Sequence, residues 1–327
     1  MDADRLDQLI DRADVDELIR VVQEQSGEEQ WEHVLQLRDR CRAAAATGRQ
    51  LWPVASLAEY RLALDAPGRW AGAVLVDGAG PFALGPLTEV VAVRHGWEEL
   101  APHLPAAPAA SFVAHERVLR GEDLRTNGEV DAGGLDLPLA LQPWEPSYAL
   151  AEYHADRAEF PAPPWPRLQQ ATLPPPGEPV GDPEAVVALR ELVTPWTTGS
   201  NGKADVVVVE GDHTTAIAAL GHRRVRLASI GTDDALAWMA WAGASGGAHG
   251  RRRGAANGRF GAWWAAAAIA GVLDLWPMTP DELGDELTAL QWYAWATDDA
   301  ATGWQLRLAV WDPAEDLGFA IDASDHA

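Results

Sequence analysis

The sequence predicts a two-domain α+β protein, in which an all-helical N-terminal domain precedes a Trp-rich α+β domain with a small mixed sheet. The chain has 327 residues, whereas a single hydrophobic core stops growing at about 250–300 residues. Its hydrophobic content is 47%, which is ample for packed cores. The spacing of apolar residues changes after a proline-rich stretch. We therefore expect a helical domain at 1–125, a Gly/Pro-rich connection at 126–182 and an α+β domain at 183–327.

The helical domain is predicted from apolar residues that recur three to four positions apart, as on one face of a helix. Turn signals at Gly48, Pro53 and 66–69 separate the helices. Successive short helices predict stacked helical hairpins, similar in architecture to an α-solenoid. Because no repeat of about 34 or 40 residues is found, an ordinary helical bundle is the alternative. Three stripes begin at Leu6, Val15 and Trp31, and further helices are expected at 54–64, 69–76, 87–95 and 109–120.

The connection at 126–182 is rich in glycine and proline. Proline runs at 161–166 and 174–179 predict local polyproline stiffness, and the spacing of Pro161 and Pro164 is a weak docking motif. We expect part of this segment to pack onto a domain because it carries four large aromatic residues, Trp144, Tyr148, Tyr153 and Trp165. Its glycines are Gly128, Gly133 and Gly134, with others further on.

The second domain is predicted to open with a helix and a β-α-β unit. The β-branched run Val206–Val209 is typical of a central strand buried on both faces. A helix at 212–220 and a strand at 223–230 complete the unit. The expected later elements are a helical hairpin at 233–244 and 251–273, a helix at 280–290, and a β-hairpin at 292–297 and 304–311.

Charge and composition limit the classes of partner. A net charge of -24 opposes broad binding to nucleic acids or anionic membranes and favours basic partners. Lys203 is the only lysine, a bias typical of a high-GC bacterium. Cys41 is the only cysteine, so we expect neither an intramolecular disulfide nor a cysteine-based metal site. The charged start of the chain lacks an apolar secretory core, and the longest apolar run, 260–273, is shorter than a membrane span. We therefore expect a cytoplasmic protein without a membrane segment.

The first candidate site is a stretch at 235–273 that contains no acidic residue. Seven residues in it are candidates for ligand binding. Arg252 and Arg259 are seven positions apart, so a helix would place them on one face. A glycine turn ahead of a helix offers free backbone N–H groups to a phosphate or carboxylate. Alternatively, the arginines contact a protein partner or pair with the chain's own carboxylates, and the glycines allow close helix packing. The seven residues are Arg251, Arg252, Arg253, Arg259, Asn257, Gly247 and Gly250.

Catalysis has weaker candidates. Asp212 and His213 follow a predicted strand, where α/β proteins often place reactive groups, and His249 lies beside the arginines. The alternative is that Asp212 only caps the following helix. No metal-binding motif occurs, and we expect no cofactor.

Tryptophan is unusually frequent, with 16 residues. Exposed rings beside arginines would suit single-stranded nucleic acid, but the net charge opposes that partner and large rings are more often core. We therefore expect a non-enzymatic, adaptor-type binding or regulatory protein with a protein partner. The alternative is an enzyme or sensor for a small anionic ligand at the glycine- and arginine-rich segment, with Arg252, Arg253 and Arg259 holding the anion and His249 or His213 transferring a proton.

Overall fold

The computed structural model describes residues 3–126, 134–299 and 302–326 of the chain. Gly128 and Gly133 of the predicted connection lie outside these residues. The chain divides into two compact units, the first formed by 1–135 with 151–160 and the second by 136–150 with 161–327. The first unit is helical and the second combines helices with a sheet, which confirms the predicted two-domain α+β class.

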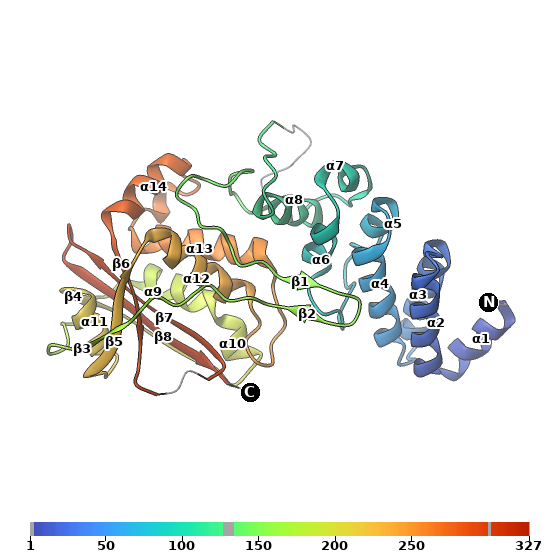
Figure 1. Ribbon diagram of the computed structural model, residues 1–327, viewed down its shortest axis with the longest axis horizontal. Helices are drawn as coiled ribbons and strands as arrows, with labels where there is room; N and C mark the ends of the chain where they lie inside the picture. Colours follow the sequence, from blue (N-terminus) through green and yellow to red (C-terminus); the bar gives the residue numbers. More distant parts are fainter. Residues whose placement is uncertain (1–2, 127–133, 300–301, 327) are drawn as a thin grey trace. The chain divides into compact units, whose positions relative to one another are not determined.

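The first unit consists of short helices joined by short turns (Figure 1). Its elements are α1 (Ala3–Arg12), α2 (Val15–Gly27), α3 (Trp31–Ala46), α4 (Trp52–Asp65), α5 (Gly68–Ala73), α6 (Leu87–Arg94), α7 (Trp97–Leu100), η1 (Ala101–His103), α8 (Ala109–Leu119), β1 (Glu152–Tyr153) and β2 (Ala158–Glu159).

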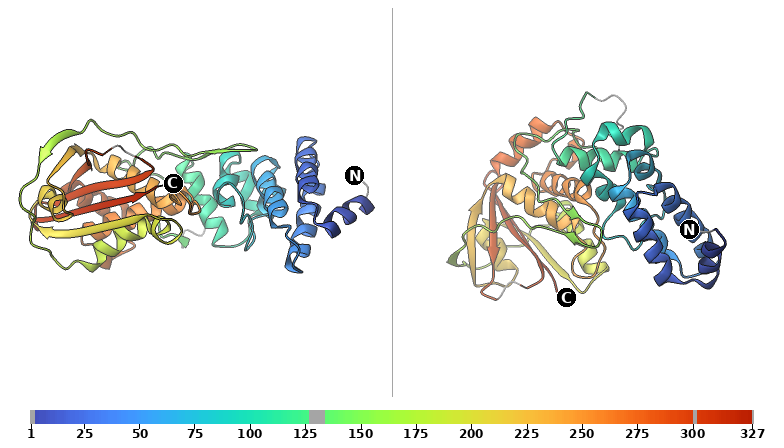
Figure 2. Two further views of the ribbon diagram at one scale, coloured as in Figure 1. Left: turned by 90° about the horizontal axis from the view of Figure 1, so that it is seen from below. Right: turned by 45° about the vertical axis from the view of Figure 1, so that its right-hand side comes forward.

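The helices of the first unit stack in two rows. Helices α2, α4, α6 and α8 contact one another in succession, and α3, α5 and α7 do the same. Contacts between sequence neighbours, such as α3 and α4, join the rows, as Figure 2 allows the reader to follow. The innermost helix is α4, in which Val54, Ala58 and Leu62 are fully buried. The unit is therefore a set of stacked helical hairpins.

The β1–β2 hairpin packs on this helical stack. The Tyr153 hydroxyl donates a hydrogen bond to Oε2 of the buried Glu89 in α6, at 2.7 Å. The Tyr60 hydroxyl of α4 donates to the carbonyl of His154. Two tyrosines thus fasten a stretch of the predicted connection to the first unit.

The second unit is built around a six-stranded sheet. Its elements are β3 (Gln169–Thr172), α9 (Pro183–Leu192), α10 (Thr194–Thr198), β4 (Lys203–Glu210), α11 (His213–Ala219), β5 (Arg224–Ile230), α12 (Thr232–Ala244), α13 (Ala255–Ile269), η3 (Leu273–Leu275), α14 (Pro280–Ala289), β6 (Gln291–Ala296), β7 (Trp304–Asp312) and β8 (Leu317–Asp325).

The sheet corrects three predictions. Its strand order is β3-β5-β6-β7-β8-β4, and the pairings within it are antiparallel, so the sheet is not mixed. Strands β4 and β5 lie near opposite edges and do not form a β-α-β unit. The reason is β8, a strand that sequence analysis did not identify, which pairs with β4 from Lys203–Ser324 to Glu210–Leu317. Val206–Val209 therefore belongs to an edge strand rather than a central one.

The edge of β4 is covered by the chain itself. The Val180 N–H donates to the Val208 carbonyl, and the Glu210 N–H donates to the Glu178 carbonyl, both at 2.9 Å. Pro179 lies opposite Val209, and a proline has no N–H to offer further pairing on its outer side. The second proline run of the predicted connection thus leads into a cover for this edge.

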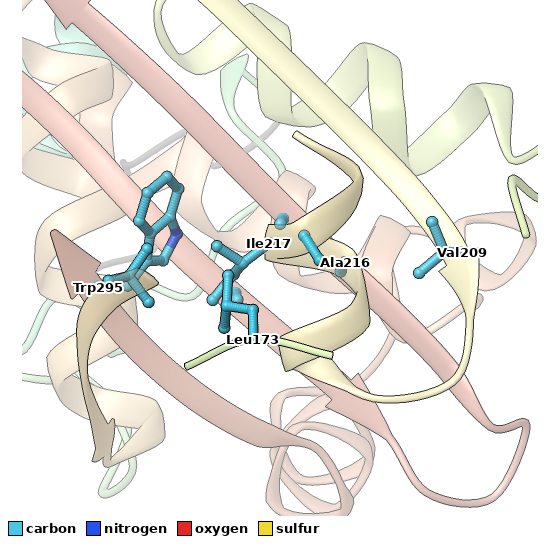
Figure 3. Packing of buried hydrophobic residues seen from close by; sticks show 9 residues of the cluster. Leu173, Val209, Ala216, Ile217 and Trp295 are labelled. Carbon is cyan, nitrogen blue, oxygen red and sulfur yellow. The ribbon is translucent and has the colours of Figure 1, made fainter. Parts of the chain in front are cut away.

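Different helices cover the two faces of the sheet. Helices α9 and α12 pack on one face, and α13 packs on α9 and α12. The short helix α11 packs on the other face, where Ala216 and Ile217 meet Val209, Leu173 and Trp295 (Figure 3). Among the helices that the structure describes, none is long and apolar enough to cross a membrane.

Candidate functional site

The glycine turn of the candidate site encloses a carboxylate of the same chain. Asp325, at the end of β8, is fully buried, and its Oδ2 atom accepts a hydrogen bond from the Ala248 N–H at 2.6 Å. Its Oδ1 atom accepts from the Ser200 hydroxyl at 2.9 Å. A Cβ atom at Gly247 would clash with Oδ2, so only glycine fits there. The turn was predicted to meet a ligand, a partner or one of the chain's own carboxylates, and the group found in it is the carboxyl group of Asp325.

A buried tryptophan, Trp196, also holds this turn in place. The indole N–H of Trp196 donates to the Ser245 hydroxyl at 3.0 Å, and the Gly247 N–H donates to the same oxygen at 3.0 Å. Trp196 is fully buried. These hydrogen bonds tie the turn to the buried core of the second unit.

The arginine run does not lie on a helix, contrary to the sequence-based expectation. Helix α13 begins at Ala255, after Gly254 with its φ of 97°. Arg252 therefore precedes the helix and does not share a face with Arg259. The Arg253 N–H donates to the Ala244 carbonyl at 2.8 Å, which ties the run to the end of α12. The start of α13 is set by its close packing on α12, since a Cβ at Gly258 would clash with the Ala240 carbonyl.

Arg259 forms an internal ion pair, which was the alternative interpretation of this arginine. Its Nε and Nη2 atoms donate to the two carboxylate oxygens of Glu145 at 2.8 and 2.7 Å, and both side chains are 0% exposed. The carbonyls of Pro138 and Ala140 accept from the same guanidinium at 2.9 and 3.1 Å. Trp263 donates its indole N–H to Glu145 at 3.0 Å. The guanidinium group of Arg259 is therefore fully occupied by partners inside the second unit, and Arg259 is not a ligand-binding residue.

The electrostatics of this pair favour the ionised form. Burial opposes ionisation of Glu145, but the hydrogen bonds and charge of Arg259, helped by the Tyr148 hydroxyl, hold its pKa below the usual value. A bidentate arginine is the geometry that best compensates a buried carboxylate.

Two of the predicted arginines do line a groove. Arg251, Arg253 and Gly250 lie along a surface hollow of about 610 Å3, opposite Thr194 and Thr198 of α10. The hollow has the size of a small-molecule site. Asn257 instead donates its amide to the Arg253 carbonyl at 2.7 Å, and the exposed His249 lies in the turn beside the groove.

The loop before α11 is a helix cap. Asp212 accepts hydrogen bonds from the N–H groups of Thr214 and Thr215 at 2.9 and 3.1 Å. The His213 ring stacks on Tyr293, with centroids 3.4 Å apart and planes 8° apart. Burial lowers the pKa of His213, and the charge of Asp212 opposes that change. The imidazole is thus neutral at neutral pH and held against the sheet.

The tryptophans of the second unit pack mainly on one another. Trp241 stacks on Trp304 with centroids 4.9 Å apart, and its other contacts are edge-to-face with Trp196 and Trp238. Trp238 is 3% exposed. Rings in these positions form a core rather than a stacking platform for bases. Trp241 and Trp304 are partly exposed, and Trp165, at 41% exposure, is the most exposed ring of this cluster.

Metal and thiol chemistry have little basis in the described part of the chain. No three His, Cys, Asp or Glu residues within it come close enough to hold a metal ion. Cys41 is buried, and burial raises the pKa of its thiol to about 12 against the effect of Arg40. A thiol of this kind is not a nucleophile at neutral pH.

Sequence analysis missed one polar cluster. His222 and Arg307 both contact Asp322, at 3.1 and 2.7 Å, on the face of the sheet that carries α11. Asp322 belongs to β8, the unrecognised strand. The alternation along β7, which places Arg307 on the side opposite Leu306 and Leu308, was the one signal that pointed to a polar side chain on that face.

Three comparisons with known proteins place the chain only broadly. The model of a family described as "Family of unknown function (DUF6183)" matches residues 16–323. Neither the search of curated proteins nor that of solved structures gave a match.

Proposed function

Because the chain belongs to DUF6183, a family of unknown function, we propose from its geometry that it is a non-enzymatic, adaptor-type protein whose first unit binds another protein. The observation that carries this proposal is an exposed apolar loop between α5 and α6. Val76, Phe82 and Leu84 in this loop are 44%, 64% and 42% exposed. Exposed apolar groups that cluster on one surface are typical of docking sites.

Two hydrogen bonds anchor the backbone of this loop to helix α4. The Gly80 N–H donates to Oε2 of Glu59 at 2.6 Å, and the Phe82 N–H donates to the Ser56 hydroxyl at 3.3 Å. Both partners come from the buried helix α4. A loop that is ordered before binding loses less entropy on association, so this anchoring supports a docking role.

The partner is expected to present apolar side chains flanked by basic ones. The net charge of -24 favours a basic surface, and the exposed Asp77 lies in the loop itself. Stacked helical hairpins commonly serve as binding scaffolds. A cytoplasmic location is part of this proposal, supported by a single, buried cysteine.

The test is photo-cross-linking from position 82 in cells that produce the chain naturally. The control places the same cross-linker at position 275, where Leu275 of the second unit is 63% exposed. We expect one protein adduct from position 82 only. The purified adduct partner should then bind the variant Phe82→Ser/Leu84→Ser at least about ten-fold more weakly than the wild type, and bind Leu275→Ser normally. Equal affinity for all three would contradict the proposal, as would an adduct between two copies of this chain.

A second candidate function rests on the groove beside α10. Arg251 and Arg253 line it together with Glu191, Thr194 and Thr198, and guanidinium groups suit a small phosphate- or carboxylate-bearing ligand. The test is a thermal-shift screen of nucleotides, sugar phosphates and coenzyme A esters. Stabilisation that Arg251→Gln/Arg253→Gln abolishes would support it, whereas a blank screen would remove it for those compounds.

A further inference from the structure

A second hollow in the second unit is lined by basic residues and by apolar ones, which form its floor. It has a volume of about 640 Å3 and lies where α11 ends and β5 begins. His222, Arg223 and Arg224 line it, together with Leu173, Pro175 and Ala218. None of these residues lines the groove of Arg251 and Arg253, so this hollow is a separate place.

The His222 ring is held in a fixed orientation. Its Nε2 atom lies 3.1 Å from Oδ2 of Asp322, and its ring centroid lies 5.0 Å from that of the buried Trp295. Asp322 is itself oriented, because Nε of Arg307 donates to its Oδ1 atom at 2.7 Å. A carboxylate on one imidazole nitrogen fixes the tautomer and the role of the other. With Nε2 held by Asp322, the His222 ring forms an ordered part of the wall of the hollow.

The floor of the hollow is preformed. Leu173 and Ala218 belong to the hydrophobic cluster between α11 and the sheet, which Figure 3 shows around Leu173 and Ile217. Pro175 lies in a run of three prolines, whose backbone φ angles are restricted. Such a surface offers apolar contact to a ligand without first having to become ordered.

The charges indicate the class of ligand. Three neighbouring basic residues are unusual in a chain of net charge -24. The carboxylate of Asp322 faces both His222 and Arg307, so its charge is compensated. Guanidinium groups are suited to carboxylates and phosphates, and the apolar floor is suited to a hydrocarbon or ring.

We propose that this hollow is a binding site for a small organic anion. Arg223 and Arg224 contact its carboxylate or phosphate, and its apolar body lies on Leu173 and Pro175 beside the His222 ring. This site is independent of the protein-binding loop of the first unit. The competing explanation is that His222 and Asp322 only fasten the end of α11 to β8.

The experiment is calorimetric titration of the full chain with benzoate and phenyl phosphate, and with uncharged benzyl alcohol as the control ligand. We expect at least one charged probe to bind with a dissociation constant of about 1 mM or lower and benzyl alcohol not to bind. Preference between the two charged probes tells carboxylate from phosphate. Binding of the charged probe should shift the imidazole 15N resonances of His222.

Matched variants separate this hollow from the other groove. Arg223→Gln/Arg224→Gln should weaken binding by at least about ten-fold, and His222→Gln should weaken it less, whereas Arg251→Gln/Arg253→Gln should leave it unchanged. The proposal is overturned if neither charged probe binds, if benzyl alcohol binds equally well, or if Arg223→Gln/Arg224→Gln binds like the wild type. An unchanged melting temperature of each variant excludes loss of the fold as the cause.

Discussion

An arginine–glutamate pair of the first unit, Arg42–Glu59, and one of the second unit, Arg259–Glu145, differ in how completely they are removed from water. In the first unit, Nη1 of Arg42 lies 2.7 Å from Glu59, and the arginine keeps 21% of its side-chain surface exposed. In the second, Arg259 and Glu145 are both 0% exposed. Removing one partner of a pair leaves a charge whose cost depends on the water that can reach it. The comparison therefore predicts that the two units respond differently to the same substitution.

The two pairs also hold different things in place. Arg42 donates to the carbonyl of Asp77 at 3.1 Å and Glu59 accepts from Gly80, so the pair fixes a surface loop. Arg259 and Glu145 join α13 to the 138–145 segment through backbone carbonyls and Trp263. The pair of the first unit thus holds an exposed loop in place, whereas the pair of the second unit fastens a segment to the core.

The largest effect is expected from Arg259→Met. The substitution leaves Glu145 buried without its counter-charge, so the free energy of unfolding of the second unit should fall by about 3–5 kcal/mol. Urea unfolding followed by tryptophan fluorescence measures it. The double variant Arg259→Met/Glu145→Met should recover most of the loss, because no uncompensated charge is left. A loss below about 1 kcal/mol would show that the pair behaves like a surface pair.

A smaller effect is expected from Arg42→Met. Water can reach the vacated position, so the loss should be about 1–3 kcal/mol, as for a hydrogen bond to a charged group. Hydrogen exchange at the Gly80 amide should accelerate, since Glu59 then lacks the cation that positions it. If Arg42→Met lowered the free energy of unfolding as much as Arg259→Met does, the cost of removing the arginine would not depend on its exposure.

Acid should act on the second unit through Glu145. Because the folded pKa of Glu145 is lower than its usual value, its contribution to stability is complete above the unfolded pKa of about 4.3 and is lost as pH falls through the folded pKa. The wild type should therefore lose stability below about pH 4 more steeply than Glu145→Gln does. Parallel pH profiles of the two proteins, measured by urea unfolding, would contradict this expectation.

The smallest effect is expected from Phe82→Ser. The side chain is 64% exposed, and exposed substitutions usually change stability by no more than about 0.5 kcal/mol. The order of the loop should persist, because Glu59 and Ser56 hold its backbone rather than its apolar tips. A melting temperature several degrees lower would mean that Phe82 packs within the unit and does not form a docking surface.

Local patterns in the sequence predicted the features that depend on neighbouring residues, namely helices and helix caps. Apolar spacing gave the helices of the first unit, and Asp212 was a recognisable cap because its partners, Thr214 and Thr215, follow directly. The partners of Arg259 were not recognisable in this way. Glu145 lies in a stretch that composition assigned to a connection, 114 positions away in the sequence, and no periodicity links two such residues.

The sheet was predicted incompletely for a related reason. Strand β8 is buried on both faces over much of its length, yet it contains Asp322, Ser324 and Asp325. Both carboxylates have partners on other elements, Asp322 with Arg307 and Asp325 with Ser200, so the strand tolerates them. Without β8, neither the antiparallel order nor the carboxylate within the glycine turn could be found. The start of α13 was misplaced because Gly254 and the packing of Gly258 on α12 override helix propensity.

Strand β4 is synthesised on the ribosome well before β8, its partner in the sheet. Lys203 pairs with Ser324 and Glu210 with Leu317, so β4 leaves the exit tunnel long before its neighbour in the sheet is made. Contacts between residues so far apart in sequence close slowly, and unpaired strands are prone to aggregate during that interval. The 178–180 segment precedes β4 and is already present when β4 emerges. It can therefore act as a temporary neighbour, keeping one edge of the nascent strand occupied until translation delivers the other.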